Sequence, residues 1–235
     1  MFSSGHNDSS HTEDSHWLSV SDLMAGLMIV FLFIAISLMR NAFIERDKIK
    51  KVAVAYQDTQ VAIYDALMGE FDNDIDKWNA EIDKETITFT FKSPDVLFEN
   101  GEIALKEEYK YILSDFFPRY METLDKFSES INEVRIEGHT SSIWNNAVSN
   151  NEAYFLNMEL SQGRTRSVLD YVYNLTELED KYKPWIKQNI AAVGLSSSRA
   201  IYENGVENED KSRRVTFRVI TNADIRIKQI LEVDA

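Results

Sequence analysis

The feature that most constrains the fold of this chain is an apolar run near its start. Residues 17–39 read WLSVSDLMAGLMIVFLFIAISLM, and Leu18 to Met39 would form roughly 33 Å of helix at about 1.5 Å per residue. A cleavable signal peptide has a basic start, a shorter apolar core and a small-residue cleavage site, and this segment has none of them. The run therefore predicts a single transmembrane helix, which carries one carboxylate, Asp22, near its beginning.

Composition excludes several classes of function. The tail of residues 1–16 is polar and lacks Lys and Arg, so we expect a solvated, disordered segment. The chain has no cysteine, which excludes disulfides and thiolate metal sites. With 39 acidic against 25 basic residues the net charge is −14, and phosphate backbones would repel it. We expect no direct binding of nucleic acid, and no metal or other cofactor.

Residues 40–84 predict an extended helical linker after the apolar run. Gly69 and the DND of residues 72–74 are points where this helix can break or bend. The apolar residues of this segment form a stripe along one face of the helix. This stripe must pack either against a second copy of the chain in a parallel dimer or against the domain that follows. The apolar residues recur at threes and fours through Asn41–Asp83: Ile49, Val52, Tyr56, Ile63, Leu67, Phe71, Ile75, Trp78 and Ile82.

Residues 85–222 predict a compact domain of strands and helices. TITFTF alternates from Thr86 and predicts a strand, and a helix over 102–127 is expected to be interrupted near Pro118. The stretch NEVRIEGHT predicts a second strand that ends at Gly138. A helix is expected over residues 151–175. Further strands are expected over residues 190–193 and in the stretch RRVTFRVI. Residues 223–235 predict a closing helix. The predicted fold class is α+β: one transmembrane helix, a helical linker and a C-terminal α/β sandwich.

Three stretches of this domain resemble OmpA-like peptidoglycan-binding domains. IEGHTSS (136–142), NMELSQGRTRSVLDYV (157–172) and SRRVTFRV (212–219) follow the order of that family's motifs, and DVLFENGEIAL (95–105) is similar to the turn before its first helix. The resemblance implies a groove for the peptide stem of peptidoglycan. The groove residues implied are Thr140, Ser141, Leu156, Asn157, Leu160 and Arg164.

The helical motif has its own physical logic. Asn157, Leu160 and Arg164 are spaced i, i+3 and i+7, so they share one helix face. A guanidinium there suits the carboxylates of the stem, because its planar fork binds them bidentately. The alternative is that Leu160 belongs to the core and Arg164 to a surface salt bridge.

One position departs from the family pattern. The family's aspartate after GHT binds the amine of the stem's diamino acid, and Ser141 stands in its place, so Glu152 and Asp210 are candidates for the missing charge. His139 lies beside Thr140 and Ser141, but no set of base, nucleophile and orienting group is evident. We therefore expect no enzyme activity.

The apolar run resembles the first span of MotB-like stator subunits. WLSVSDLMAGLM fits their W-x-x-x-x-D-x-M-x-x-x-M core, and the polar tail is most similar to the ZorB branch, which belongs to Zorya anti-phage systems. The resemblance implies that Asp22 carries H+ or Na+, and the Ser21 hydroxyl can help to order water or the ion. A carboxylate in a membrane is costly and usually faces a water path or a partner. The alternative is a first-turn carboxylate near the headgroups.

A single span cannot enclose an ion path, so a partner must complete it. The resemblance implies a MotA/ZorA-like membrane protein, five copies around a homodimer of this chain. It also implies a bacterial inner-membrane protein with a cytoplasmic N-terminus and a periplasmic domain on peptidoglycan. The positive-inside rule favours the opposite orientation, because the basic residues follow the run. A passive wall anchor, a flagellar-type stator subunit and a protein-binding module are the alternatives.

Overall fold

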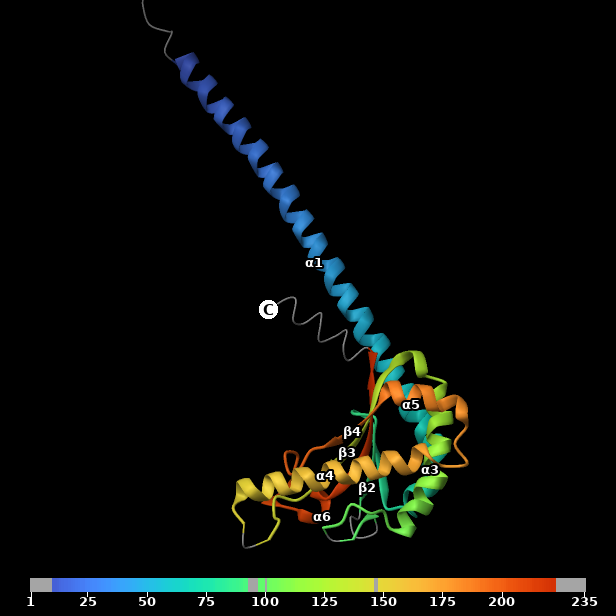
Figure 1. Cartoon of the computed structure of the whole chain (residues 1–235). Helices are drawn as coiled ribbons and strands as arrows, with labels where there is room; N and C mark the ends of the chain where they lie inside the picture. Colours follow the sequence, from blue (N-terminus) through green and yellow to red (C-terminus); the bar gives the residue numbers. More distant parts are fainter. Residues whose placement is uncertain (1–9, 93–96, 100, 146–147, 223–235) are drawn as a thin grey trace, which may run out of the picture. The chain divides into compact units, whose positions relative to one another are not determined.

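The structure is a computed structural model that describes residues 10–92, 97–99, 101–145 and 148–222. The chain divides into two compact units, Met1–Val52 and Ala53–Ala235. Helix α1 (Ser10–Ile75) contributes to both, and all other elements belong to the second unit (Figure 1). The closing helix expected over 223–235 lies outside the described residues.

The second unit contains a mixed sheet and several helices. The strands are β1 (Ala80–Asp83), β2 (Thr88–Lys92), β3 (Ile131–His139), β4 (Ile190–Gly194), β5 (Tyr202–Glu203), β6 (Val206–Glu207) and β7 (Arg214–Thr221). The helices are α3 (Glu107–Asp125), α4 (Asn150–Tyr173), α5 (Lys183–Asn189) and α6 (Glu209–Ser212), with short 3-10 turns at Ser128–Ser130 and Asp180–Tyr182.

The main sheet has the strand order β1-β2-β7-β3-β4. Strands β3 and β4 pair in parallel, with α4 and α5 in the connection between them, and the other neighbours are antiparallel. Strands β5 and β6 form a separate two-stranded hairpin. This topology places the C-terminal end of β3 next to the start of β7, since His139 pairs with Arg214.

Alternation along the central strands separates an apolar face from a polar one. Phe89 of β2 and Phe217 of β7 are fully buried and pack with Phe116 of α3, with ring centroids 4.6 and 5.1 Å from that ring. Phe71, at the end of α1, joins this cluster 5.2 Å from Phe116. A fully buried aromatic side chain contributes on the order of 2–3 kcal/mol, so this cluster supplies much of the domain's stability.

The end of α1 is part of this core. Ile63, Leu67 and Phe71 of the predicted linker stripe have no exposed surface, which confirms the second of the two covers considered for that stripe. Gln60 lies between Tyr56 and Ile63, where the apolar repeat is interrupted. Its Nε2 donates to the carbonyls of Lys84 and Glu85. Upstream, in the first unit, Ile49 is 38% exposed.

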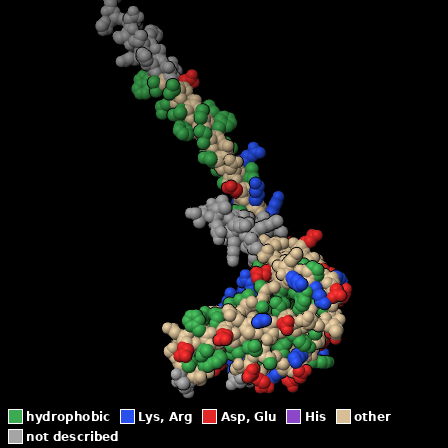
Figure 2. All heavy atoms as spheres, in the orientation of Figure 1, with side chains coloured by type: hydrophobic (Ala, Val, Ile, Leu, Met, Phe, Trp, Pro, Cys, Tyr) green, Lys and Arg blue, Asp and Glu red, His purple; other side chains and the backbone are tan. Residues whose placement is uncertain are grey.

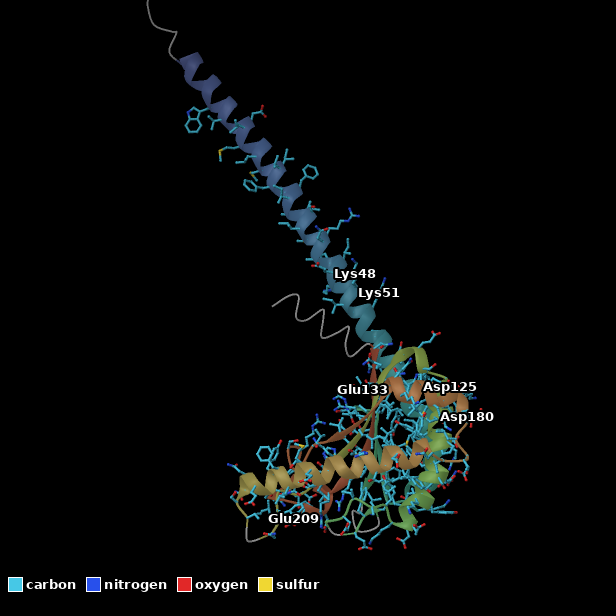
Figure 3. The ribbon with its side chains drawn as sticks, in the orientation of Figure 1. Lys48, Lys51, Asp125, Glu133, Asp180 and Glu209 are labelled. Atoms are coloured by element: carbon cyan, nitrogen blue, oxygen red, sulfur yellow. The ribbon has the colours of Figure 1, made fainter. Side chains whose placement is uncertain are left out.

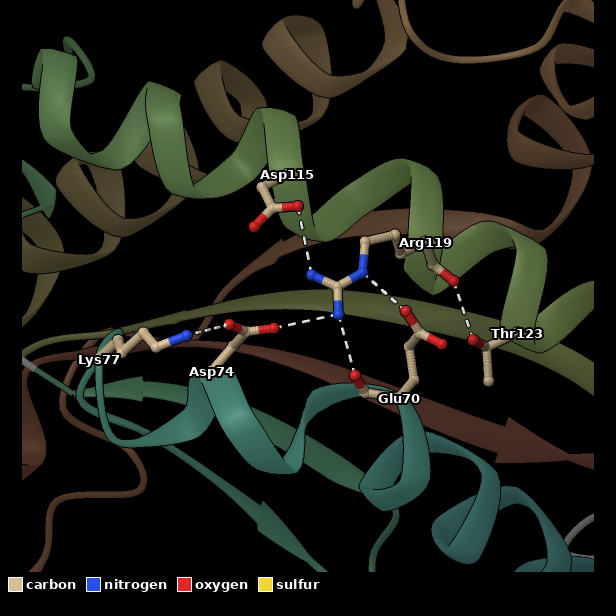
Figure 4. A network of polar contacts seen from close by, with 6 residues as sticks. All are labelled: Glu70, Asp74, Lys77, Asp115, Arg119 and Thr123. Atoms are coloured by element: carbon tan, nitrogen blue, oxygen red, sulfur yellow. Dashed lines mark hydrogen bonds and ion pairs between the residues drawn. The ribbon is translucent and has the colours of Figure 1, made fainter.

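Arg119 of α3 fastens that helix to the end of α1 (Figure 4). Its guanidinium donates to Glu70 Oε1 at 2.7 Å, to Asp74 Oδ2 at 3.0 Å and to Asp115 Oδ1 at 3.2 Å. It also lies over the Phe71 ring, 4.8 Å from the centroid. Burial alone would lower the pKa of Arg119, but the three carboxylates raise it above its ordinary value. The group is therefore charged at every physiological pH.

Several predicted boundaries were wrong. The helical repeat runs to Asp83, but the helix ends at Ile75, directly after the DND of residues 72–74 that was named as a break point, and Ile82 falls in β1. The strand expected from Thr86 begins at Thr88, because Ile87 has a φ of 47° and turns the chain. Helix α3 is not interrupted but runs through Pro118. Of the tail expected to be disordered, the residues from Ser10 onward are helical. The short elements β5, β6, α5 and α6 were not expected.

The predicted fold class is nevertheless confirmed. The chain has an apolar N-terminal helix, a helical segment after it and a C-terminal α/β domain with a mixed sheet. The three motif stretches fall on the end of β3, on α4 and on β7, as their patterns predict.

Candidate functional site

A cavity of about 350 Å³ lies at the C-terminal end of β3. The segment before α3, the loop after β3, the middle of α4 and α6 with the residue after it contribute to its wall. Its polar lining residues are Thr140, Ser141, Asn157, Arg164, Glu209 and Arg213. Its other lining residues are Phe98, Gly101, Ile143, Trp144 and Leu160.

The cavity brings together five of the six residues predicted for the groove. Thr140, Ser141, Asn157, Leu160 and Arg164 all line it. The sixth, Leu156, is half-buried on the preceding turn of α4 and is not among the described lining residues. The spacing of the helical motif therefore placed its three members on the face that meets the cavity.

Local interactions hold these side chains in place. Helix α4 begins after Ser149, whose Oγ accepts a hydrogen bond from the Glu152 amide at 3.3 Å. About two turns further along α4, Asn157 is 3% exposed and donates from Nδ2 to the Ser141 carbonyl at 3.1 Å. This bond joins α4 to the loop after β3. Asn157 is therefore a positioning residue, with its amide hydrogen-bonded to the protein.

Arg164 combines burial with an unusual set of partners. Its guanidinium donates to the carbonyls of Glu102 at 2.9 Å and Glu99 at 3.1 Å, and lies 4.7 Å from the centre of the Phe98 ring. Burial, and then the positive charge of Arg213, lower the pKa of Arg164 to about 10. It forms no salt bridge with any carboxylate of the described residues, unlike the surface salt bridge considered as an alternative. A positive charge held this way attracts an anion.

The loop after β3 is fixed on its outer side. Ser142 donates to the Glu207 carboxylate through both its amide, at 2.9 Å, and its hydroxyl. The Thr140 amide donates to the Ser196 carbonyl at 3.0 Å. The Thr140 hydroxyl is buried and has no hydrogen-bond partner among the described residues. Leaving a buried hydroxyl unpaired costs free energy, so this group favours a polar ligand in the cavity.

Neither candidate for the charge missing at Ser141 is among the described residues that line the cavity. Glu152 lies in the first turn of α4, and Asp210 pairs with Arg213 at 2.5 Å; neither is among the described lining residues. Glu209 lines the cavity instead. Sequence reasoning also missed Phe98, Trp144 and Arg213 as lining residues. Phe98 and Arg213 lie inside the quoted motifs, which gave the one available signal for them.

His139 belongs to a different environment. It is 5% exposed, and its Nε2 lies 3.6 Å from Glu137 Oε2, while Arg199 pairs with the same carboxylate at 3.3 Å. Burial lowers the pKa of His139, so the imidazole is neutral at pH 7. Burial would raise the pKa of Glu137, but His139 and Arg199 lower it below its ordinary value. His139 is not among the described residues that line the cavity.

The other predicted site is in the first unit. Among the described residues, one stretch is long and apolar enough to cross a membrane, Val20–Lys51 of α1. Its side chains are exposed, and those drawn in Figure 2 are mainly hydrophobic. Ser21 and Asp22 lie near its beginning and are exposed. The basic residues lie at its far end, where Lys48 and Lys51 are labelled in Figure 3.

The chain is similar to one protein family and to several known proteins. The model of the OmpA family matches residues 97–214. Zorya protein ZorB from Escherichia coli (strain Crooks) is 52% identical over 221 residues, which cover 94% of this chain and 94% of that protein. Among solved structures, a MotB-like protein from Desulfovibrio vulgaris has a TM-score of 0.49 at 21% identity, covering 73% of this chain and 94% of that one. The periplasmic domain of Helicobacter pylori MotB has a TM-score of 0.43 at 18% identity, covering 66% and 90%.

The two sequence matches cover the domain and almost the whole chain, respectively. The OmpA match includes the cavity residues from Phe98 to Arg213, and the ZorB match extends over both compact units. The chain therefore belongs to the ZorB family and carries an OmpA-family domain.

Proposed function

We propose that this protein is the peptidoglycan-anchored subunit of an ion-driven membrane motor that serves an anti-phage defence system. The observation that carries the anchoring role is Arg164, a desolvated guanidinium without a carboxylate partner among the described residues, in a cavity formed by the predicted motif residues. The stem peptides of peptidoglycan carry carboxylates, which are the natural partners of such a fork.

The ion-carrying role is proposed for Asp22, with Ser21 in support. The carboxylate lies near the start of an apolar stretch, where an ionisable group is costly and usually functional. A single helix offers no closed path, so the proposal requires a MotA/ZorA-like membrane protein, with five copies around a dimer of this chain. The transported ion is H+ or Na+. The exposed Ile49 and its neighbours in α1 offer a surface for dimer contact.

The proposal places the N-terminus in the cytoplasm and the domain in the periplasm. The basic residues after the apolar run favour the reverse orientation, and we propose that contacts with the partner's helices outweigh them.

Sedimentation with purified peptidoglycan sacculi tests the anchoring role. The detergent-solubilised full chain should sediment with sacculi, and Arg164→Ala should weaken binding by at least about ten-fold, because charge-assisted hydrogen bonds are lost. Arg164→Lys keeps the charge without the fork and should give an intermediate loss. Arg166→Ala is the matched control, since Arg166 is exposed on the same helix and lies outside the cavity lining.

Circular dichroism of each variant checks that the total helix content is unchanged. Binding of Arg164→Ala equal to that of Arg166→Ala would contradict the assignment of the cavity. Failure of the unaltered chain to sediment with sacculi would contradict peptidoglycan anchoring altogether.

A further inference from the structure

The cavity contains a simple balance of charges. Arg213 has a carboxylate partner outside the lining, since its Nη2 lies 2.5 Å from Asp210 Oδ1. Arg164 has no ion pair with the described residues and is the free positive charge. Glu209 is the single carboxylate among the described lining residues. The cavity lining therefore presents one charged group of each sign, Arg164 and Glu209, that has no ion-pair partner among the described residues.

The Glu209 side chain is available for a ligand. It is exposed at the start of α6, where Figure 3 labels it, and it forms no ion pair or hydrogen bond with the described residues. The neighbouring carboxylates are already engaged, since Glu207 accepts two hydrogen bonds from Ser142 and Asp210 pairs with Arg213. Of the three acidic residues on this segment, Glu209 is the one with no partner among the described residues.

We propose that Glu209 binds the ammonium group of a ligand whose carboxylate is bound by Arg164. The cavity would then recognise the free amino-acid end of a diamino acid, with the Thr140 hydroxyl as a further polar contact. The inference rests on the proposed peptidoglycan function and goes beyond it by assigning the residue that selects for the amine. In this arrangement the negative charge comes from α6 and not from position 141.

The chemistry explains why Ser141 can be neutral. Ser141 belongs to the loop after β3, where its backbone carbonyl accepts a hydrogen bond from Asn157. Glu209 instead stands on α6, so that the two opposite charges of the ligand would be held by different elements. Because Glu209 is exposed, water screens its attraction for an ammonium group, and its contribution should be selectivity more than affinity.

A pair of soluble stem peptides tests this assignment. The first probe is the tripeptide L-alanyl-γ-D-glutamyl-meso-diaminopimelate with its side-chain amine free, and the second is the same peptide acetylated on that amine. Titration calorimetry on the full chain in detergent should give a Kd about three- to five-fold lower for the free amine. Glu209→Gln should bring the two Kd values together without weakening the acetylated peptide. Glu152→Gln, at an exposed carboxylate outside the lining, should behave like the unaltered chain.

The outcomes separate the two proposals. A preference for the free amine that survives in Glu209→Gln would overturn the role of Glu209 and leave the anchoring role intact. Binding of sacculi together with equal Kd values for both peptides in the unaltered chain would also overturn it. Failure to bind sacculi and both peptides would instead reject the proposed function itself.

Discussion

At the scale of single residues, Arg119 shows how one side chain joins two helices. Its fork reaches Glu70 and Asp74 on α1 and Asp115 on its own helix, while its flat face covers Phe71. Lysine has neither the fork nor the flat face, so it cannot make all four contacts. The position is half-buried, which makes the three ionic contacts stronger than those of a typical surface pair.

We predict that Arg119→Ala destabilises the domain by roughly 2 kcal/mol, because partly buried carboxylates lose their partner and the aromatic ring loses its cover. Arg119→Lys should lose about half as much. Urea unfolding of the full chain, followed by tryptophan fluorescence, measures both. Arg166→Ala is the control and should unfold like the unaltered chain. A midpoint for Arg119→Ala equal to the control would mean that the contacts contribute nothing.

The sequence predicted the site residues that lie within one motif, but not those that are brought to the site from distant parts of the chain. Asn157, Leu160 and Arg164 were predictable because a helical repeat fixes which residues share a face. Glu209 was not, because its place in the cavity depends on how α6 approaches α4, and no local pattern encodes that distance. The same holds for Trp144, which follows the GHT motif in a loop whose course is set by Glu207.

At the scale of elements, two strong local signals were overridden. The helical repeat continued past Ile75, but Asn79, with a φ of 47°, reverses the chain and Ala80–Asp83 pairs with β2 as an edge strand. The apolar residues there serve the sheet with a period of two and happen to fit the helical spacing as well. Pro118 was expected to interrupt α3, yet packing of Phe116, Phe117 and Tyr120 keeps the helix continuous. Burial of these rings outweighs the cost of one proline, about 3 kcal/mol.

Two glycines, Gly138 of β3 and Gly194 of β4, lie where α4 packs closely on the sheet. A Cβ at Gly138 would lie 2.8 Å from the Ser161 carbonyl oxygen and 2.8 Å from Thr165 Cγ2. Gly138→Ala should therefore push α4 away from β3, destabilise the domain by about 1–3 kcal/mol and weaken binding to sacculi.

Gly69→Ala is the matched control for this prediction, because nothing lies within 4 Å of a Cβ at that position of α1. It should stabilise the chain by about 0.5–1 kcal/mol, as expected for alanine in an exposed helix interior. Thermal unfolding measures both variants. Equal shifts of the same sign would show that the close approach at Gly138 has no energetic weight.

At the scale of the whole molecule, the proposed motor needs both units, the first to carry the ion and the second to bind peptidoglycan. Asp22→Asn keeps the size and hydrogen bonding of the side chain but cannot hold a titrating charge. In cells that carry the complete defence system, this variant should lose protection against phage, measured as plaque counts, while it still accumulates in the membrane and binds sacculi. Asp47→Asn, at an exposed aspartate further along α1, should retain protection. Protection by Asp22→Asn would leave a passive wall anchor as the better description.

The size of the cavity has a consequence for the strength of attachment. A volume of about 350 Å³ holds on the order of ten water molecules, so it admits the end of one stem peptide and leaves the sugar chain outside. A site this small makes few contacts and exchanges its ligand quickly. In the proposed dimer, two such sites would act on the same polymer, and the second would bind at a high effective concentration. Firm attachment would then come from the avidity of two weak, rapidly exchanging binding sites. Each site could release its stem peptide and bind another as the wall is remodelled.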